Sequence, residues 1–278
     1  MSGYKFDYEK KVWGGEILRL SPIHFRASRL FWALKEIPNK KGKLLDVGCG
    51  VGDFVESFNY YRPGMDISAI DISKKAIVLA KKRKVRADFK AGDAQKLPFA
   101  NNTFDVVTCF DLIEHVRYPK KVLKEIRRVL KPGGIFHTFI PTEKNLLSIE
   151  GLFIKLGWKG KEIYGGHPHH FSKRQVISWL EEAGFKVNKV RWGEHFVNQI
   201  IEVLYFSWLY IRGKNTKITV EGYLATSKSN IVIGIAKLIK SALATLSFIE
   251  TIALFWFPGL GVHVTCSKIE ANRKRKDG

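Results

Sequence analysis

The residues best suited to chemistry lie in LLDVGCGVGDF, at positions 44–54, where an apolar run ends in an acid and a glycine-rich turn follows. The three glycines are Gly48, Gly50 and Gly52. Such turns usually hold phosphates on bare backbone N–H groups. Here the third glycine comes one residue early for a dinucleotide site, and no Gly-Lys-Ser/Thr follows for a P-loop. Because Asp46 and Asp53 would also repel a phosphate, the turn predicts a nucleoside ligand without phosphates.

S-adenosylmethionine fits this prediction, since it offers an ammonium, a sulfonium and an adenosine but no phosphate. Asp71 comes 21 residues after Gly50, where an acid at the end of a second strand accepts hydrogen bonds from the ribose hydroxyls. Asp93, in AGDAQKLPF, is placed to accept from the adenine amino group. Ligands of open α/β sheets bind outside the carboxyl ends of the strands, so we expect these acids to meet at one edge.

Alternating strands and helices must position these residues. We expect helices at 52–60, 74–84 and 119–130, and strands at 43–48, 64–71, 85–90, 103–110 and 135–140. A further helix is predicted within 171–185, with Ser172 as its N-cap and Gly184 as its stop. Strands are then predicted at 186–192 and 261–269. This alternation favours a parallel sheet with helices on both faces.

The segments LLDVGCGVGDF, AIDIS, GDAQKLPF, FDVVTCFDLIEHV and VLKPGG follow one another in this order. With them the chain resembles the class I S-adenosylmethionine-dependent methyltransferases, and is similar to the small-molecule and quinone-biosynthesis O-methyltransferases. The resemblance covers about 41–141 and extends more loosely to 193. It implies a Rossmann-like α/β fold with a seven-stranded sheet in the order 3-2-1-4-5-7-6, with residues 261–269 as the antiparallel strand. It also implies S-adenosylmethionine as cofactor, bound by Asp46, Gly48, Cys49, Gly50, Asp71, Ile72, Asp93, Ala94 and Phe110.

Four regions are expected along the chain. Residues 1–41 form a helical lead-in, residues 42–193 with 261–270 form the methyltransferase core, residues 194–260 form an apolar helical insertion, and residues 271–278 form a basic tail.

Histidines are the candidate catalytic groups, because a hydroxyl acceptor must lose a proton to a base whose pKa lies near the operating pH. His115 follows the fourth strand in DLIEHV, and His170 lies in GGHPHHFS with His167 and His169. We take His115 and His170 as the candidates, while a purely structural role for either remains open. Glu114 with His115 could instead hold a divalent metal that polarises a catechol-like acceptor, but their spacing alone predicts no metal site.

The apolar insertion raises a separate question. Between positions 237 and 253, helical periodicity gathers one apolar stripe, which consists of Leu238, Ile239, Ala242, Leu246, Ile249 and Ala253. Lys237, Lys240, Ser241 and Thr251 fall on the opposite side, as in an amphipathic helix. Such a helix can serve as a lid, as a dimer contact or as a contact with a membrane interface.

Charge and composition constrain the partners. The 278-residue chain has 47 basic and 26 acidic residues, a net charge of +21, which suits an anionic membrane surface or a nucleic acid. Three scattered cysteines and a charged start favour a reducing, cytoplasmic setting. We predict a methyltransferase for a lipid-like or lipid-linked hydroxyl, approached from the inner face of the cell membrane. An RNA methyltransferase is the alternative, although FDLIEH lacks the Pro-Pro-Tyr/Phe run of base amino-methyltransferases. A third possibility is a binding protein that keeps the fold without turnover.

Overall fold

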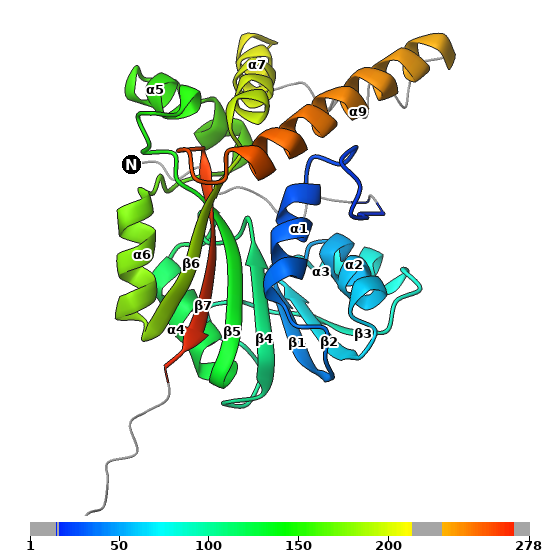
Figure 1. The fold of residues 1–278 in the computed structure, drawn as a ribbon, viewed down its shortest axis with the longest axis vertical. Coiled ribbons are helices and arrows are strands. Elements are labelled where there is room, and N and C mark those ends of the chain that lie inside the picture. Colours follow the sequence, from blue (N-terminus) through cyan, green and yellow to red (C-terminus); the bar gives the residue numbers. More distant parts are fainter. Residues whose placement is uncertain (1–14, 16, 213–229, 270–278) are drawn as a thin grey trace, which may run out of the picture.

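The computed structural model describes residue 15 and residues 17–212 and 230–269 of the chain. Its centre is a seven-stranded sheet in the order β3-β2-β1-β4-β5-β7-β6 (Figure 1). The strands are β1 (Gly42–Val47), β2 (Met65–Asp71), β3 (Ala87–Ala91), β4 (Phe104–Phe110), β5 (Leu130–Pro141), β6 (Phe185–Gly193) and β7 (Gly261–Lys268). The first five are parallel, and β7 runs antiparallel to both β5 and β6. The predicted fold and strand order are therefore confirmed.

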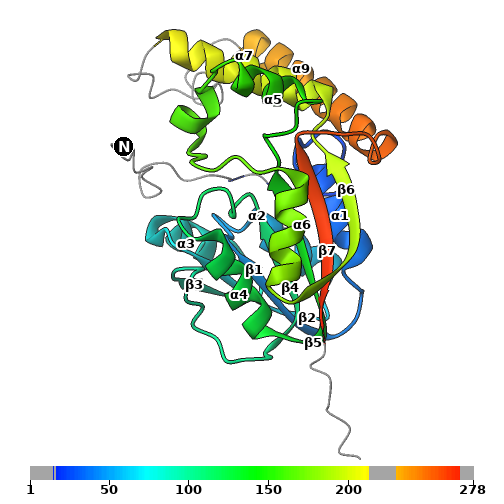
Figure 2. The same cartoon turned by 90° about the vertical axis from the view of Figure 1, so that its left-hand side faces the viewer.

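Helices cover both faces of the sheet (Figures 1 and 2). The helices are α1 (Ala27–Glu36), α2 (Asp53–Tyr61) and α3 (Lys74–Lys81) on one face, and α4 (Pro119–Val129) and α6 (Lys173–Glu182) on the other. Each face has its own buried apolar cluster, one built around α1, α2 and α3 and the other around α4 and α6. The sheet is thus held between two hydrophobic layers, which stabilise it independently of any ligand.

Local signals account for most element ends. Ser172 accepts a hydrogen bond from the Gln175 N–H at 3.2 Å, and Gly184 has a φ of +87° just after α6, so the predicted cap and stop are confirmed. The fifth strand differs from the expectation, because it begins at Leu130 rather than at Ile135. The residues KPGG, which were expected to lie before the strand, therefore belong to β5. The pairing of β5 with β4 shifts register between Phe104 and Val106, so this part of the strand is irregular.

A helical layer lies beyond the carboxyl ends of the parallel strands (Figures 1 and 2). It consists of α5 (Ile149–Lys155), the π-helix η1 (Lys161–Gly165), α7 (Phe196–Arg212) and α9 (Asn230–Ala253). The connection from β5 to α6 supplies α5 and η1, and the connection from β6 to β7 supplies α7 and α9. Among the described residues, no helix combines the length and the apolar character needed to cross a membrane.

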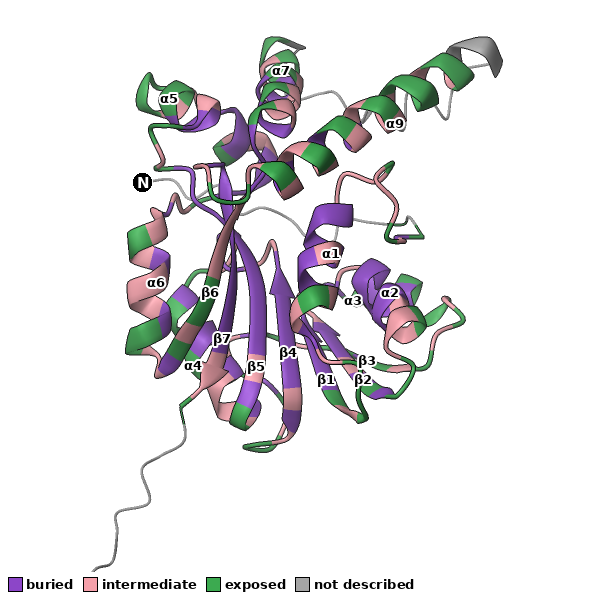
Figure 3. Cartoon of the chain, in the orientation of Figure 1, coloured by how far each residue is buried: buried purple, intermediate pink, exposed green. Residues whose placement is uncertain are grey.

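Helix α9 turns its apolar stripe away from the rest of the protein. All six stripe residues are exposed, and Leu238 reaches 71%. The buried side carries Ala244, Ser247 and Thr251, and Ser247 donates a hydrogen bond to the Asn198 side chain of α7 at 2.9 Å. Exposed residues recur along α9 (Figure 3). In the described residues α9 thus packs through small and polar side chains and not through its apolar stripe.

The two ends of the chain are described only in part. The lead-in contains a helix only over Ala27–Glu36 in the described residues, and Pro22 separates it from the preceding segment. The predicted basic tail, 271–278, lies outside the described residues.

Candidate active site

The glycine turn between β1 and α2 folds over the end of β2. Its three glycines, Gly48, Gly50 and Gly52, have φ values of +79°, +53° and +85°, a region that residues with a Cβ rarely adopt. The backbone N–H groups of Gly48 and Cys49 both donate to the Ile70 carbonyl, at 2.8 and 3.1 Å. The turn is therefore a fixed backbone loop rather than a flexible linker.

Asp71 ties this turn to the second strand. One of its carboxylate oxygens accepts from the Gly50 N–H at 2.8 Å, and the other accepts from the Ser73 N–H at 2.9 Å. Asp71 thus lies directly beside the glycine turn, and its contact with a ribose stays a prediction.

Asp46 lies beneath the same turn and is 2% exposed. The Thr108 hydroxyl donates to its carboxylate at 2.6 Å. Burial, opposed by this hydrogen bond and reinforced by the charge of Asp71, raises the pKa of Asp46 to about 7. A positively charged ligand would stabilise the ionised form, so the two carboxylates, Asp46 and Asp71, fit S-adenosylmethionine better than a phosphate.

The other residues expected at the cofactor lie at the ends of neighbouring strands. Asp93 and Ala94 follow β3, and Asp93 accepts hydrogen bonds from Gln95. Ile72 is exposed, whereas Phe110 is buried and stacks on Phe54 with ring centroids 4.4 Å apart. The strand order brings all of these positions to one edge of the sheet, as the sequence predicts.

Asp53 differs from the expectation that its charge faces the ligand. It is buried, and the guanidinium groups of Arg26 and Arg83 both bind its carboxylate. The Gly15 N–H also donates to it, at 3.1 Å. Its charge is therefore compensated within the protein, and the sequence offers no signal for this because the arginines lie 27 and 30 residues away.

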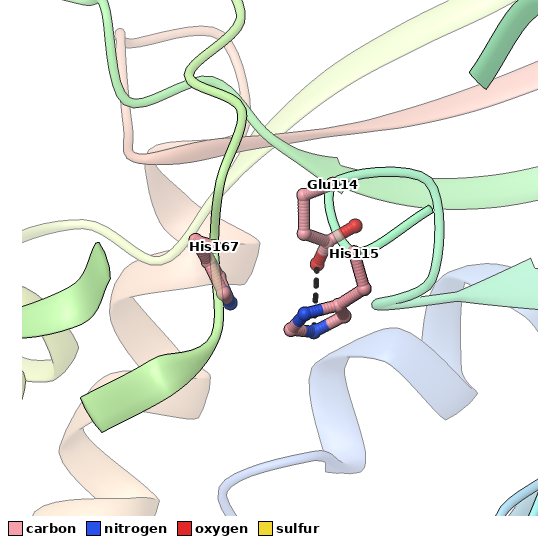
Figure 4. Close-up of side chains that lie close together, drawn as sticks. All are labelled: Glu114, His115 and His167. Atoms are coloured by element: carbon pink, nitrogen blue, oxygen red, sulfur yellow. Dashed lines mark ion pairs between the residues drawn. The ribbon is translucent and has the colours of Figure 1, made fainter. Parts of the chain in front are cut away.

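A second cluster forms just past β4, where Glu114 and His115 meet His167 from the loop after η1 (Figure 4). Their potential ligand atoms all lie within 4.8 Å of one another. The Glu114 Oε1 and His115 Nε2 atoms are 3.9 Å apart, and the two imidazole centroids are 4.6 Å apart. Residues more than 50 positions apart thus form one polar group.

Hydrogen bonds assign the tautomers of both histidines. His115 Nδ1 lies 2.8 Å from the Gly166 carbonyl oxygen, and His167 Nδ1 lies 2.6 Å from Glu143 Oε1. A carbonyl and an ionised carboxylate can only accept, so each Nδ1 carries a proton, and the lone pair of either imidazole in its neutral form is on Nε2. Lone-pair nitrogens on two imidazoles are what a metal ion or a proton requires.

Glu114 is the unusual member of this cluster. It is completely buried, and neither of its carboxylate oxygens has a hydrogen-bond partner in the described part of the chain. Burial and then the charge of Asp111 raise the pKa of Glu114 well above its usual value. A buried carboxylate in this state takes up a proton or a cation, so Glu114, His115 and His167 fit a divalent metal ion with one carboxylate and two imidazoles.

The two candidate catalytic histidines, His115 and His170, lie at different distances from the cluster. His115 lies in the cluster, whereas His170 reaches it only through Glu143, whose Oε2 accepts from His170 Nδ1 at 2.6 Å. Of the loop histidines, His167 is the one whose ring contacts His115. Glu143 was missed altogether, because a glutamate after a strand carries no motif of its own.

The chain is similar in sequence to known methyltransferases. Residues 45–138 match a family model described as a methyltransferase domain. The ubiquinone biosynthesis O-methyltransferase of Thiobacillus denitrificans is 33% identical over 197 residues, covering 67% of this chain and 83% of that protein. A demethylmenaquinone methyltransferase of Renibacterium salmoninarum is 42% identical over 102 residues, covering 37% of this chain and 41% of that protein. The chain spans about two fifths of the length of the demethylmenaquinone methyltransferases that it matches.

A solved structure agrees in fold. Phosphoethanolamine N-methyltransferase 2 of Haemonchus contortus, in complex with phosphomonomethylethanolamine and S-adenosylhomocysteine, aligns with a TM-score of 0.56 at 18% identity, covering 87% of this chain and 52% of that one.

Methyltransferases are the class that the fold, the glycine turn and the matching family model together define. Within that class, the chain belongs to the class I S-adenosylmethionine-dependent methyltransferases of the quinone-biosynthesis type. S-adenosylmethionine is accordingly its cofactor.

Proposed function

We propose that this protein transfers a methyl group from S-adenosylmethionine to a hydroxyl of a lipid-like or lipid-linked acceptor, such as a prenylated quinone precursor. The observation that carries the proposal is the Glu114, His115 and His167 cluster beside the carboxyl end of β4, next to the cofactor edge. The names of the quinone-biosynthesis relatives support the acceptor class. Transfer of labelled methyl groups to such an acceptor tests it.

The cofactor residues divide the ligand among them in this proposal. Asp71 accepts from the ribose hydroxyls, Asp93 accepts from the adenine amino group, and the Asp46 carboxylate faces the positive charge of the methionine moiety. The backbone at Gly48 and Gly50, with Cys49, Ile72, Ala94 and Phe110, surrounds these groups. Burial of Asp46 and Phe110 keeps water from the inner side of the site.

The transfer itself is an in-line displacement. The bond from acceptor oxygen to methyl carbon forms while the bond from carbon to sulfur breaks, and S-adenosylhomocysteine leaves with a neutral thioether sulfur. Positioning supplies much of the rate. The acceptor hydroxyl proton goes to an imidazole Nε2 of the cluster, for which His115 and His167 are the candidates and His170 is a more distant one.

A divalent cation at Glu114, His115 and His167 is the second chemistry that this cluster supports. The unpartnered, buried carboxylate of Glu114 favours it. Such a cation would lower the pKa of a catechol-like hydroxyl and so ease its deprotonation. The three protein residues would then hold the cation, and His170 would remain outside its coordination.

The helical layer supports an approach from a membrane surface. Its exposed large apolar residues include Leu152 and Phe153 on α5 with Leu156 directly after it, Leu204, Trp208, Tyr210 and Ile211 on α7, and Leu238, Ile239, Leu246 and Ile249 on α9. Exposed Lys155 and Lys237 lie on the same helices. Apolar side chains beside lysines suit the interface of an anionic bilayer, and the excess positive charge of the chain is in keeping with this rather than with a nucleic-acid face.

We expect replacement of Leu238 and Ile249 by serine to reduce binding to anionic vesicles at least tenfold. Each side chain is more than half exposed, and its transfer into the acyl boundary contributes about 1 kcal/mol or more. Flotation with anionic and neutral vesicles, at low and high salt, measures this binding.

The matched control replaces Val78 and Leu79 of α3, which are also exposed apolar residues, by serine. Equal loss in both double variants, or no flotation of the native protein under any condition, would contradict the membrane contact. Self-association detected by sedimentation, lost only in the α9 variant, would assign the stripe to a dimer.

A further inference from the structure

We propose that Glu143 is a positioning residue for a divalent cation at Glu114, His115 and His167, acting through His167. The inference rests on the cation-binding chemistry proposed above for this cluster. Glu143 itself is outside the cluster, because both of its oxygens face histidine Nδ1 atoms.

Glu143 is built into the protein as an acceptor of two hydrogen bonds. It is 1% exposed, and its two oxygens lie 2.6 Å from the Nδ1 atoms of His167 and His170. The contact between the Glu143 carboxylate and His167 Nδ1 fixes a proton of His167 on Nδ1.

The backbone around Glu143 keeps this geometry rigid. On one side, the Thr142 N–H donates to the Leu260 carbonyl at 2.6 Å, and on the other, the Lys144 N–H donates to the Phe171 carbonyl at 3.0 Å. The backbone on either side of Glu143 is thus hydrogen-bonded to the residues just before β7 and just before α6. A carboxylate on such a support can orient an imidazole without moving itself.

The contact with Glu143 decides which nitrogen of His167 can bind the cation. With Nδ1–H bound to Glu143, the lone pair of His167 is on Nε2, the nitrogen on the side of the ring away from Glu143. His115 has the same arrangement through the Gly166 carbonyl. Metal-binding histidines commonly donate their second N–H to a carboxylate or a carbonyl, and loss of that partner typically weakens metal affinity 10- to 100-fold.

Lys161 provides a matched control for this role. Its ammonium lies 3.6 Å from Glu143, 3.2 Å from Glu150 and 2.6 Å from Glu202. Glu202 therefore belongs to the same ion-pair network, and in the described residues it pairs with Lys161 and not with a histidine. Glu202→Gln changes the charge of the network as Glu143→Gln does, without removing the hydrogen bond to His167.

The experiment measures Mn²⁺ binding to the full chain by electron paramagnetic resonance, in the native protein and in Glu143→Gln, Glu202→Gln and Glu114→Gln. We expect saturable binding that Glu114→Gln abolishes, that Glu143→Gln weakens about 10- to 100-fold, and that Glu202→Gln changes less than threefold. Glutamine fills the same volume but carries an amide NH2 in place of one carboxylate oxygen, so it replaces one of the two acceptors that face the Nδ1 atoms by a donor and also removes the charge.

The outcomes separate the two claims. No saturable Mn²⁺ binding by the native protein would refute the cation site itself. Binding lost in Glu114→Gln but equal in Glu143→Gln and Glu202→Gln would overturn the role of Glu143 and leave the cation site standing. If Glu143→Gln does not fold, ¹⁵N NMR of the native histidines decides: a proton on His167 Nδ1 supports the role, and a proton on Nε2 overturns it.

Discussion

Replacement of Asp71 by alanine should weaken binding of S-adenosylmethionine at least about 100-fold. In our proposal this carboxylate accepts from two ribose hydroxyls, and hydrogen bonds to a charged group contribute about 1.5–3 kcal/mol each. Two such bonds correspond to about two to four powers of ten in affinity. The carboxylate also binds the Gly50 and Ser73 N–H groups, so its loss loosens the glycine turn as well.

Isothermal titration calorimetry with S-adenosylhomocysteine measures this loss. Asp66→Ala is the matched control, because Asp66 is an exposed acid on the same strand with no place at the site. Affinity within threefold of native in both variants would show that the ligand does not use Asp71. Loss in both would indicate damage to β2 rather than to the ribose contact.

The second large effect concerns stability. Replacement of Lys161 by methionine should cost about 3–5 kcal/mol in the free energy of unfolding at pH 8, the usual penalty for removing one partner of a buried ion pair. The Lys161 side chain is 6% exposed and faces Glu143, Glu150 and Glu202. Without it, Glu143 and Glu150 would remain buried with no neighbouring ammonium.

The penalty should grow with pH. Burial already raises the pKa of Glu150 well above its usual range, and the Lys161 ammonium opposes that rise, so its removal raises the folded-state pKa of Glu150 further. Such groups favour folding at low pH, and this stability is lost as the pH rises through the folded pKa. Urea unfolding at pH 5.5 and pH 8 tests this, with Lys159→Met, at an exposed lysine, as control. A pH-independent penalty, or an equal loss in the control, would refute it.

The core was predictable because its signals are local. Apolar runs ending in an acid or a glycine mark β1, β2 and β4, and Ser172 with Gly184 marks α6. The order of the strands came from a resemblance in which five short segments keep their spacing. The carboxyl edge where Asp46, Asp71 and Asp93 meet then followed from the rule that ligands of such sheets bind there.

The remaining features depend on contacts between distant residues. Periodicity finds the apolar stripe of α9 but does not say which side packs, and here Ser247 and Thr251 face the protein while Leu238 faces outward. In the same way, no local sequence pattern around Asp53 predicts its ion pairs with Arg26 and Arg83. The pairing of Glu143 with His167 spans 24 residues, so no local pattern predicts which loop histidine lies beside His115.

Methyl transfer to an acceptor held in a vesicle distinguishes the proposed activity from RNA methylation. The full chain is incubated with methyl-labelled S-adenosylmethionine, anionic vesicles containing a prenylated catechol, and, in a parallel reaction, total RNA. The account predicts label in the organic phase as a methyl ether, none in RNA, and none anywhere with Asp71→Ala. Label in RNA alone, or no transfer to the prenylated catechol by protein that binds S-adenosylmethionine, would contradict it.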